Sequence, residues 1–405
     1  MARLPGIDPP EQVVCHVDMD CFYAACERLR EPALENEPLV VGMGYEPGET
    51  HGAVATASYE AREHGVESAM AISEALELLP RRADADPEES VGFYRPVDME
   101  FYESVSDEVR SVFSADAETV RNVSIDEAYL DLGDLNWSEA TAVGRSLKRR
   151  IESTAGVVAS VGIAPDMTTA KLASDADKPD GLVVVEPSDV RSFLDPMPVE
   201  ELHGVGPVTA SELQAMGFET AGEIAVDEAA TFVDAFGERG RDLYAQARGE
   251  DDRQVEPKGD PKSISSESAF VKATDDVGRK TEKLRALAGE VAERAAAKNA
   301  LYRTIGIKVV KPPFDINTRA RSLSGPVEDP TLVERTAVEL LEEFEPEPVR
   351  KLGVRLSNLS FDDRDQATIA DWEGVDSDGD DGDRSFNSLD RDRTRGGQAE
   401  LSRFE

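Results

Sequence analysis

The feature that most constrains this chain is a pair of adjacent acidic residues within a stretch that otherwise favours a β-strand. Asp126 and Glu127 follow Val123 and Ile125 and precede an apolar run over residues 128–132. Successive side chains of a strand point to opposite faces, so the two carboxylates can act together only at a hairpin tip or a strand end. The stretch is therefore either an exposed acidic turn or a place where carboxylates meet cations.

A second stretch, about a hundred residues earlier, favours the cation interpretation. Val13, Cys15 and Val17 alternate as one face of a short strand that runs into Asp18, and a helix is expected from about residue 21 to 30. A strand-end aspartate with a distant Asp-Glu pair is the ligand set that two-metal phosphoryl chemistry requires. Mg²⁺ prefers such hard oxygen ligands and takes only a few of them from protein.

Several motifs in one order resemble those of the Y-family translesion DNA polymerases, and most of all the archaeal and bacterial DNA polymerase IV branch. The resemblance extends over residues 11 to 361. The motifs are Val17–Tyr23, Ala53–Arg62, Ser124–Asp131, Ser160–Ala164 and Lys171–Gly181.

The resemblance implies an α+β multidomain fold shaped like a right hand. The expected parts are a ferredoxin-like palm, small fingers, a helical thumb with a helix-hairpin-helix, and a βαββαβ little finger. We expect helices over 98–113 and 137–154 in the palm, from their periodicity. The expected domains are palm 1–29 and 91–185, fingers 30–90, thumb 186–250, linker 251–261, little finger 262–361, a disordered acidic linker 362–397 and a clamp-binding peptide 398–405.

The net charge opposes a DNA-binding function at first sight. The 405 residues carry 83 acidic and 44 basic side chains, a formal charge of −39. The basic residues are 12 lysines and 32 arginines, and no lysine precedes Lys148. Such an acid-rich, lysine-poor composition resembles proteins of extreme halophiles, in which high salt screens self-repulsion.

The charge is also uneven along the chain. Residues 262–361 carry 17 basic and 15 acidic side chains, so this segment alone is slightly positive. Its basic stripe could follow a phosphate backbone, although a charged strand edge that blocks aggregation is the alternative. The candidate DNA-binding cations are Lys298, Arg303, Lys308, Arg319 and Arg321.

The resemblance assigns the carboxylates to catalysis and to metal binding. It implies that Asp18 and Asp126 hold both of two Mg²⁺ ions, with Glu127 on one ion and the Met19 carbonyl on the other. It also implies that Tyr23 is a steric gate that excludes a ribose 2′-hydroxyl, supported by Phe22. Without the resemblance, these two aromatic residues would be read as core.

Nucleotide binding is expected in the fingers and in one turn of the palm. Thr56, Tyr59 and Arg62 are spaced to present a hydroxyl, a phenol and a guanidinium near one helical face, which suits a triphosphate. The alternative is a helix N-cap with a surface arginine. The resemblance adds Lys178 as a triphosphate ligand; a surface turn is the alternative, but lysine is rare in this chain.

Residues 202–210 have the alternation of glycine and apolar residues that is typical of a helix-hairpin-helix. Gly204 and Gly206 would let the backbone approach a DNA phosphate, and the next helix would present its N–H groups. This form of binding needs no lysine and tolerates an acidic background.

The C-terminal tail ends in a short apolar motif. Gln398, Leu401 and Phe404 would share one face of a helical turn that could fill a groove. The motif resembles the peptide that docks on the sliding clamp PCNA, although Glu405 replaces the final aromatic residue. A frayed tail is the alternative.

The remaining features concern the cellular location. The sequence has neither a secretory signal nor an apolar run long enough to span a membrane. Three cysteines within twelve residues, without a CxxC or a histidine cluster, argue against disulfides and zinc and fit a reducing cytoplasm.

We therefore expect a low-fidelity, template-directed DNA polymerase for translesion synthesis that uses Mg²⁺, binds primer-template DNA, dNTP and PCNA, and acts as a monomer in the cytoplasm. Two alternatives remain at this stage. A palm-type nucleotidyl cyclase would share the carboxylates but would not need a DNA-binding thumb. A non-catalytic helix-hairpin-helix scaffold for DNA repair would leave Asp18, Asp126 and Glu127 without a purpose.

Overall fold

The computed structural model describes residues 12–82, 90–115 and 117–361. The chain divides into two compact units, Met1–Lys258 and Gly259–Glu405, and each is described by itself. The boundary falls inside the linker that the sequence indicates. The finer division into palm, fingers and thumb remains a prediction. Among the described residues, no helix is both long and apolar enough to cross a membrane.

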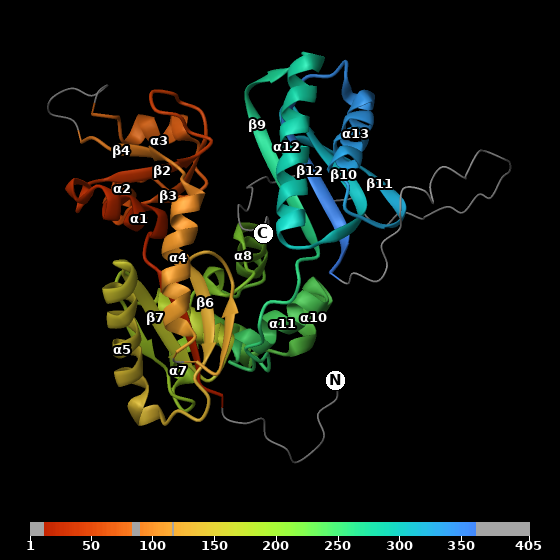
Figure 1. Ribbon diagram of the computed structural model, residues 1–405. Coiled ribbons are helices and arrows are strands. Elements are labelled where there is room, and N and C mark those ends of the chain that lie inside the picture. Colours follow the sequence, from red (N-terminus) through yellow and green to blue (C-terminus); the bar gives the residue numbers. More distant parts are fainter. Residues whose placement is uncertain (1–11, 83–89, 116, 362–405) are drawn as a thin grey trace. The chain divides into compact units, whose positions relative to one another are not determined.

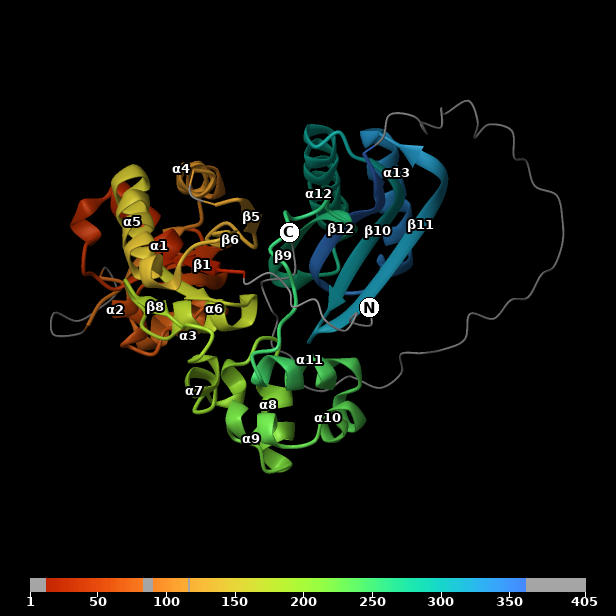
Figure 2. The same ribbon diagram turned by 90° about the horizontal axis from the view of Figure 1, so that it is seen from below.

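The centre of the first unit is a five-stranded sheet in the order β5-β6-β1-β7-β8; its strands are labelled across Figures 1 and 2. All neighbouring pairs are antiparallel except β7 and β8, which are parallel. The strands are β1 Val14–Met19, β5 Thr119–Asn122, β6 Glu127–Asp131, β7 Ala159–Ala164 and β8 Leu182–Val184.

Helices cover both faces of this sheet (Figure 2). Cys15 and Val17 pack in one core with α4 (Met99–Phe113) and α5 (Trp137–Ala155). Val14, on the other face of β1, packs with α6 (Met167–Asp175). Asp18 follows Val14 and His16 by the two-residue period, so it faces α6.

The expected palm helices are confirmed. α4 begins at Met99 because the carboxylate of Asp98 accepts a hydrogen bond from the Phe101 N–H, at 3.2 Å. α5 ends where Gly156 adopts a left-handed conformation, with φ of 70°.

A smaller sheet in the order β3-β2-β4 follows β1 along the chain. Its strands pair antiparallel between β2 and β3 and parallel between β2 and β4. The elements of this region are α1 Phe22–Arg30, η1 Pro32–Leu34, β2 Leu39–Met43, β3 Ala53–Ala57, α2 Tyr59–Arg62, α3 Ile72–Leu78 and β4 Phe93–Pro96.

The end of the first unit is helical, as expected for residues 186–250. Its apolar side chains join the core that also contains Val14 and the buried side of α6. The elements are α7 Val190–Leu194, η2 Val199–Glu201, α8 Pro207–Ala215, α9 Ala221–Val226, α10 Ala229–Phe236 and α11 Glu238–Ala247.

The second unit has the expected βαββαβ order and a four-stranded antiparallel sheet in the order β11-β10-β12-β9. α12 and α13 lie on one face of this sheet (Figures 1 and 2). Ile305, Ile307 and Val309 of β10 point into the core beneath these helices. The elements are β9 Ser263–Thr274, α12 Val277–Ala297, β10 Leu301–Lys311, β11 Asp315–Val327, α13 Pro330–Leu341, η3 Glu342–Phe344 and β12 Val349–Ser360.

Candidate active site

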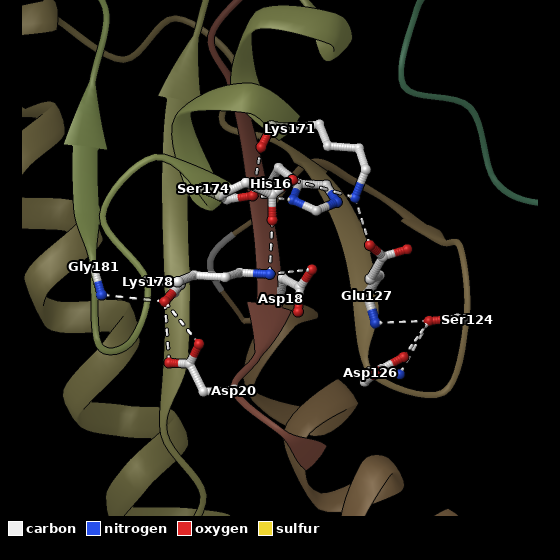
Figure 3. A network of polar contacts seen from close by, with 12 residues as sticks. His16, Asp18, Asp20, Ser124, Asp126, Glu127, Lys171, Ser174, Lys178 and Gly181 are labelled. Atoms are coloured by element: carbon white, nitrogen blue, oxygen red, sulfur yellow. Dashed lines mark hydrogen bonds and ion pairs between the residues drawn. The ribbon is translucent and has the colours of Figure 1, made fainter. Parts of the chain in front are cut away.

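The sheet register brings together the acidic residues that are remote in sequence. Asp18 of β1 lies directly opposite Glu127 of β6. The Met19 N–H donates to the carbonyl of Asp126, at 3.0 Å. Cross-strand partners point to the same face, so Asp18 and Glu127 both face α6 (Figure 3). The predicted convergence of residues 18, 126 and 127 is therefore present.

A tight turn places the Asp-Glu pair at a strand end. β5 ends at Asn122 and β6 begins only at Glu127. Between them, the Ser124 Oγ accepts from the N–H groups of Asp126 and Glu127, at 3.2 and 3.0 Å, and donates to the Asp126 carboxylate. The turn breaks the strand alternation, which is how two adjacent carboxylates can serve one site.

Two lysines neutralise this acidic site. The Lys178 Nζ lies 2.7 Å from the Asp18 carboxylate, and the Lys171 Nζ lies 2.6 Å from that of Glu127 (Figure 3). Lys171 comes from α6 and Lys178 from the turn after it. The predicted Lys178 thus reaches the site, while Lys171 was not among the predicted residues.

The pKa shifts reflect burial that the lysines offset only in part. Burial raises the pKa of Asp18 to about 7, although Lys178 acts to lower it. Burial also raises the pKa of Asp126, against the hydrogen bond from Ser124. Burial alone would lower the pKa of Lys178, but Asp18 and Asp175 outweigh it and raise that pKa. A net demand for positive charge therefore remains at the carboxylates.

Asp20 holds the parts of the site together. This buried carboxylate accepts from the hydroxyl groups of Tyr59 and Ser160, each at 3.0 Å, and from the Asp180 N–H at 2.8 Å. These donors belong to α2, to β7 and to the turn that carries Lys178. Asp20 therefore links the small sheet and the lysine turn to the strand that bears Asp18.

The expected triphosphate set is only partly gathered. The Arg62 guanidinium lies over the Tyr59 ring, 4.9 Å from its centre, and its Nε donates to the Ala57 carbonyl. Burial and the neighbouring Asp20 raise the pKa of Tyr59, so its phenol remains a donor. Thr56 lies in β3, opposite Val41. Tyr59 and Arg62 thus form one pair, whereas within the described part of the chain Thr56 makes no hydrogen bond to either of them.

The aromatic pair at the start of α1 has two different environments. Phe22 is buried in the core of the first unit. Tyr23 is half-buried and stacks on Tyr102 of α4, with ring centres 4.6 Å apart and planes 17° apart. The Tyr102 hydroxyl donates to Glu27 at 2.7 Å. The stack therefore fixes the orientation of Tyr23.

The helix-hairpin-helix glycines have open backbones. Gly204 adopts a φ of +81°, and Gly206 precedes α8. No described atom lies within 4 Å of the place that a Cβ would occupy at either glycine. Gly204 also lines a cavity of about 270 Å³ with His203, Arg239 and Arg253. A phosphate can approach this backbone without steric hindrance.

The candidate DNA-binding cations of the second unit point to different faces. Lys308 lies between the core residues Ile307 and Val309, so it points away from α12 and α13. Arg319 and Arg321 lie opposite Ile307 and Ile305, so they point toward the helices. They pair there with Glu343 and Glu339.

Lys308 is itself part of an ion-pair cluster on the helix-free face. Its Nζ lies 2.9 Å from the Glu267 carboxylate, which also contacts the Lys351 Nζ at 2.5 Å. Gly353 lies between Lys308 and Glu267 in the register, and a Cβ there would lie 2.7 Å from the Glu267 side chain. The other two cations, Lys298 at the end of α12 and Arg303 of β10, do not belong to this cluster.

Sequence reasoning missed Lys171, Asp175 and the role of Asp20. The scarcity of lysine, which singled out Lys178, applies equally to Lys171. Nothing in the sequence distinguished Asp175 from other acidic residues. The candidate clamp-binding residues Gln398, Leu401 and Phe404 lie outside the described residues.

The donor chemistry of the site fits a divalent cation. Asp18, Asp126 and Glu127 supply hard carboxylate oxygens, which divalent cations prefer. Met19, whose N–H binds the Asp126 carbonyl, directly follows Asp18. Within residues 12–82, 90–115 and 117–361, no three His, Cys, Asp or Glu side chains stand in a metal-binding arrangement. In the same site, lysine ammonium groups contact Asp18 and Glu127.

Three family models match this chain. The impB/mucB/samB family model matches residues 17–175, the model of its helix-hairpin-helix motif matches 187–218, and that of its C-terminal domain matches 261–369. The chain is 59% identical over 374 residues to DNA polymerase IV of Halobacterium salinarum, covering 92% of this chain and 91% of that relative. It is 40% identical over 363 residues to DNA polymerase IV of Methanoculleus marisnigri, covering 89% and 98%.

Solved structures agree with the fold. A Y-family DNA polymerase chimera of Dbh and Dpo4 matches with a TM-score of 0.75 and 28% identity, covering 86% of this chain and all of that one. An insertion ternary complex of Dbh DNA polymerase matches with a TM-score of 0.62 and 27% identity over the same share of this chain and the whole of that one. The full-length relationship, together with the paired carboxylates, shows that the chain belongs to the impB/mucB/samB family of Y-family DNA polymerases.

Proposed function

We propose that this chain is a low-fidelity, template-directed DNA polymerase for translesion synthesis. The observation that carries the proposal is the register of β1 and β6, which sets Asp18 beside Asp126 and Glu127. In the reaction, the primer 3′-hydroxyl attacks the α-phosphate of a dNTP, the bond to the pyrophosphate breaks, and pyrophosphate leaves. Neither a nucleotidyl cyclase nor a non-catalytic scaffold accounts for both these carboxylates and the family relationship.

The proposed cofactor is a pair of Mg²⁺ ions, held by Asp18, Asp126, Glu127 and the Met19 carbonyl. When bound, divalent ions lower the pKa of the attacking hydroxyl and neutralise charge on the phosphates. The fold of the chain orients the groups that would hold the ions and the nucleotide. The register fixes the carboxylates, and Asp20 fixes the turn that carries Lys178.

The proposed dNTP ligands come from β3, from α2 and from the turn after α6. Lys178 and Arg62 would pair with the triphosphate, with Tyr59 and Thr56 as hydroxyl donors. Tyr23, backed by Phe22 and oriented by its stack on Tyr102, would be the steric gate. An unchanged preference for dNTP over rNTP in Tyr23→Ala would reject that role.

DNA and clamp binding complete the proposal. Gly204 and Gly206 would receive backbone phosphates, and Lys308, on the helix-free face of the second unit, would contact the duplex backbone. The peptide 398–405 would dock a monomeric polymerase on the sliding clamp PCNA. Undiminished PCNA binding by a chain that ends at residue 397 would reject the peptide's role. The three buried free cysteines, Cys15, Cys21 and Cys26, support a cytoplasmic location.

Primer extension on a primed template, in molar KCl with Mg²⁺, tests the proposed function. We expect the wild-type chain to extend the primer, and Asp18→Ala or Glu127→Ala to reduce extension at least about 1,000-fold, because each removes a charge on which the transition state depends. DNA affinity should stay within about twofold, which shows that the variants are folded. Full extension by either variant would contradict the assignment.

A further inference from the structure

Asp175, the last residue of α6, lies between the two lysines of the active site. One carboxylate oxygen is 2.7 Å from the Lys178 Nζ, and the other is 3.8 Å from the Lys171 Nζ. Lys171 is four residues before Asp175 and Lys178 three residues after it, so the end of α6 brings both side chains to one carboxylate. Asp175 is not among the residues proposed to hold the cation or the nucleotide.

Each lysine therefore has two carboxylate partners, an inner one in the active site and an outer one that both share. The inner partners are Glu127 for Lys171 and Asp18 for Lys178. The outer partner of both is Asp175. All of these side chains are at most about one-third exposed, so water screens their interactions less than those of surface pairs.

The ammonium groups occupy one oxygen of Asp18 and one of Glu127, and they repel a divalent cation that approaches the other oxygens. Cation binding is therefore favoured when the two lysines withdraw. Withdrawal into a partly buried region is costly for a charge without a partner. Asp175 offers a partner that both lysines already contact, so neither has to return to solvent.

We propose that Asp175 is a positioning residue that receives the ammonium groups of Lys171 and Lys178 when divalent cations bind Asp18 and Glu127. The inference rests on the proposed function, because it assumes that these carboxylates hold cations. Asp175 acts through the lysines and does not itself bind the cation. It also keeps Lys178 beside the active site, within reach of an incoming triphosphate.

Loss of Asp175 would weaken cation binding for two distinguishable reasons. In the proposed role, the lysines lose their outer partner and hold Asp18 and Glu127 more firmly. In a simple field effect, the cation loses the attraction of one more nearby negative charge. Only the first depends on the lysines, so a double-mutant cycle separates the two.

The experiment measures Mn²⁺ binding to the full-length chain without DNA or dNTP, by the electron paramagnetic resonance signal of free Mn²⁺ in molar KCl. Four proteins form the cycle: wild type, Asp175→Asn, Lys178→Met and the double variant. We expect Asp175→Asn to weaken Mn²⁺ binding about fivefold and Lys178→Met to strengthen it. In the Lys178→Met background only the effect through Lys171 remains, so Asp175→Asn should weaken Mn²⁺ binding by only about twofold.

Two further variants serve as controls. Asp177→Asn removes the same charge two residues away. Among the described residues Asp177 forms no ion pair with a lysine, so this variant should leave Mn²⁺ affinity unchanged. Asp175→Glu keeps the charge and should restore most of the affinity. If Asp175→Asn does not fold, as judged by circular dichroism, the same cycle is run with Asp175→Ser, which removes the same charge.

Equal weakening by Asp175→Asn in both backgrounds would overturn the proposal in favour of the field effect. No weakening at all, or equal weakening by Asp177→Asn, would also overturn it. These results would leave the proposed polymerase function intact. By contrast, a wild-type chain whose Mn²⁺ binding is indifferent to Asp18→Ala would contradict the cation site itself.

Discussion

Two surfaces of the molecule carry opposite charges: the acidic active site on the five-stranded sheet and the basic, helix-free face of the four-stranded sheet. In both, side chains of the same chain form ion pairs with these charges. In the first, Lys171 and Lys178 pair with Glu127 and Asp18. In the second, Glu267 pairs with Lys308 and Lys351. Each surface thus already holds the kind of charge that its proposed ligand would supply.

These internal ion pairs explain how a chain of net charge −39 can act on a polyanion. Binding at either surface exchanges one ion pair for another and needs no large excess of positive charge. Exposed single charges would be weak in molar salt, where the Debye length is about 3 Å. Direct, partly buried pairs retain more of their energy, and they hold the side chains in place before the ligand arrives.

The two regions differ in what the resident partner does. In the active site, the lysines leave the carboxylates but remain useful, because Lys178 is proposed to bind the triphosphate. On the sheet face, Glu267 is only a competitor of the DNA phosphate. Removing Lys178 should therefore impair nucleotide insertion at the active site. Removing Glu267 should instead improve DNA binding by the face of the four-stranded sheet.

The largest effect is expected from Lys178→Met, which breaks the pair in the active site. kcat/KM for dNTP insertion should fall about 100-fold, because one preorganised cation at the triphosphate is lost. Steady-state primer extension over a range of dNTP concentrations measures this. Arg145→Gln removes a charge from α5 on the opposite side of the sheet and should have little effect. An unaltered kcat/KM in Lys178→Met would show that its pair with Asp18 is purely structural.

A smaller effect is expected from cations of the second unit, and it should depend on the face. Lys308→Ala should weaken binding to primer-template DNA about fivefold and reduce the salt slope by about one, because a phosphate contact is lost. Arg321→Ala should change affinity by less than about twofold, because its side chain pairs with Glu339 on the helical side. Fluorescence anisotropy at several KCl concentrations measures both. Equal losses would show that both faces contact DNA.

The smallest effect on DNA affinity is expected from Glu267→Gln, which should raise the affinity, whereas Lys308→Ala should lower it. Without the resident carboxylate, DNA affinity should rise about two- to threefold, and the salt dependence should become steeper by up to about one unit of slope. The same anisotropy titration detects this. Glu282→Gln, on the exposed side of α12, removes the same charge as a control. Weaker binding by Glu267→Gln would show that Glu267 orients the lysines and does not compete with DNA.

Much of the architecture could be predicted from local signals. The two palm helices, the βαββαβ order and the strand-end positions of Asp18 and the Asp-Glu pair follow from periodicity and turn residues. The faces to which Lys308 and Arg321 point could not be predicted without the register, because a shift by one residue reverses every side chain of a strand. The basic residues of this stripe therefore divide between the two faces of the sheet.

The sequence by itself determined the family, the order of the elements and the three carboxylates, because these depend on residue identity and spacing along the chain. Only the tertiary structure decided that Asp20 ties the active site together and that Asp175 is shared by two lysines. Only the fold, likewise, showed that lysines neutralise the active site while glutamates neutralise the cations of the second unit. The physical reason is that an ion pair depends on distances of a few ångströms between side chains, and strand register and helix ends set those distances.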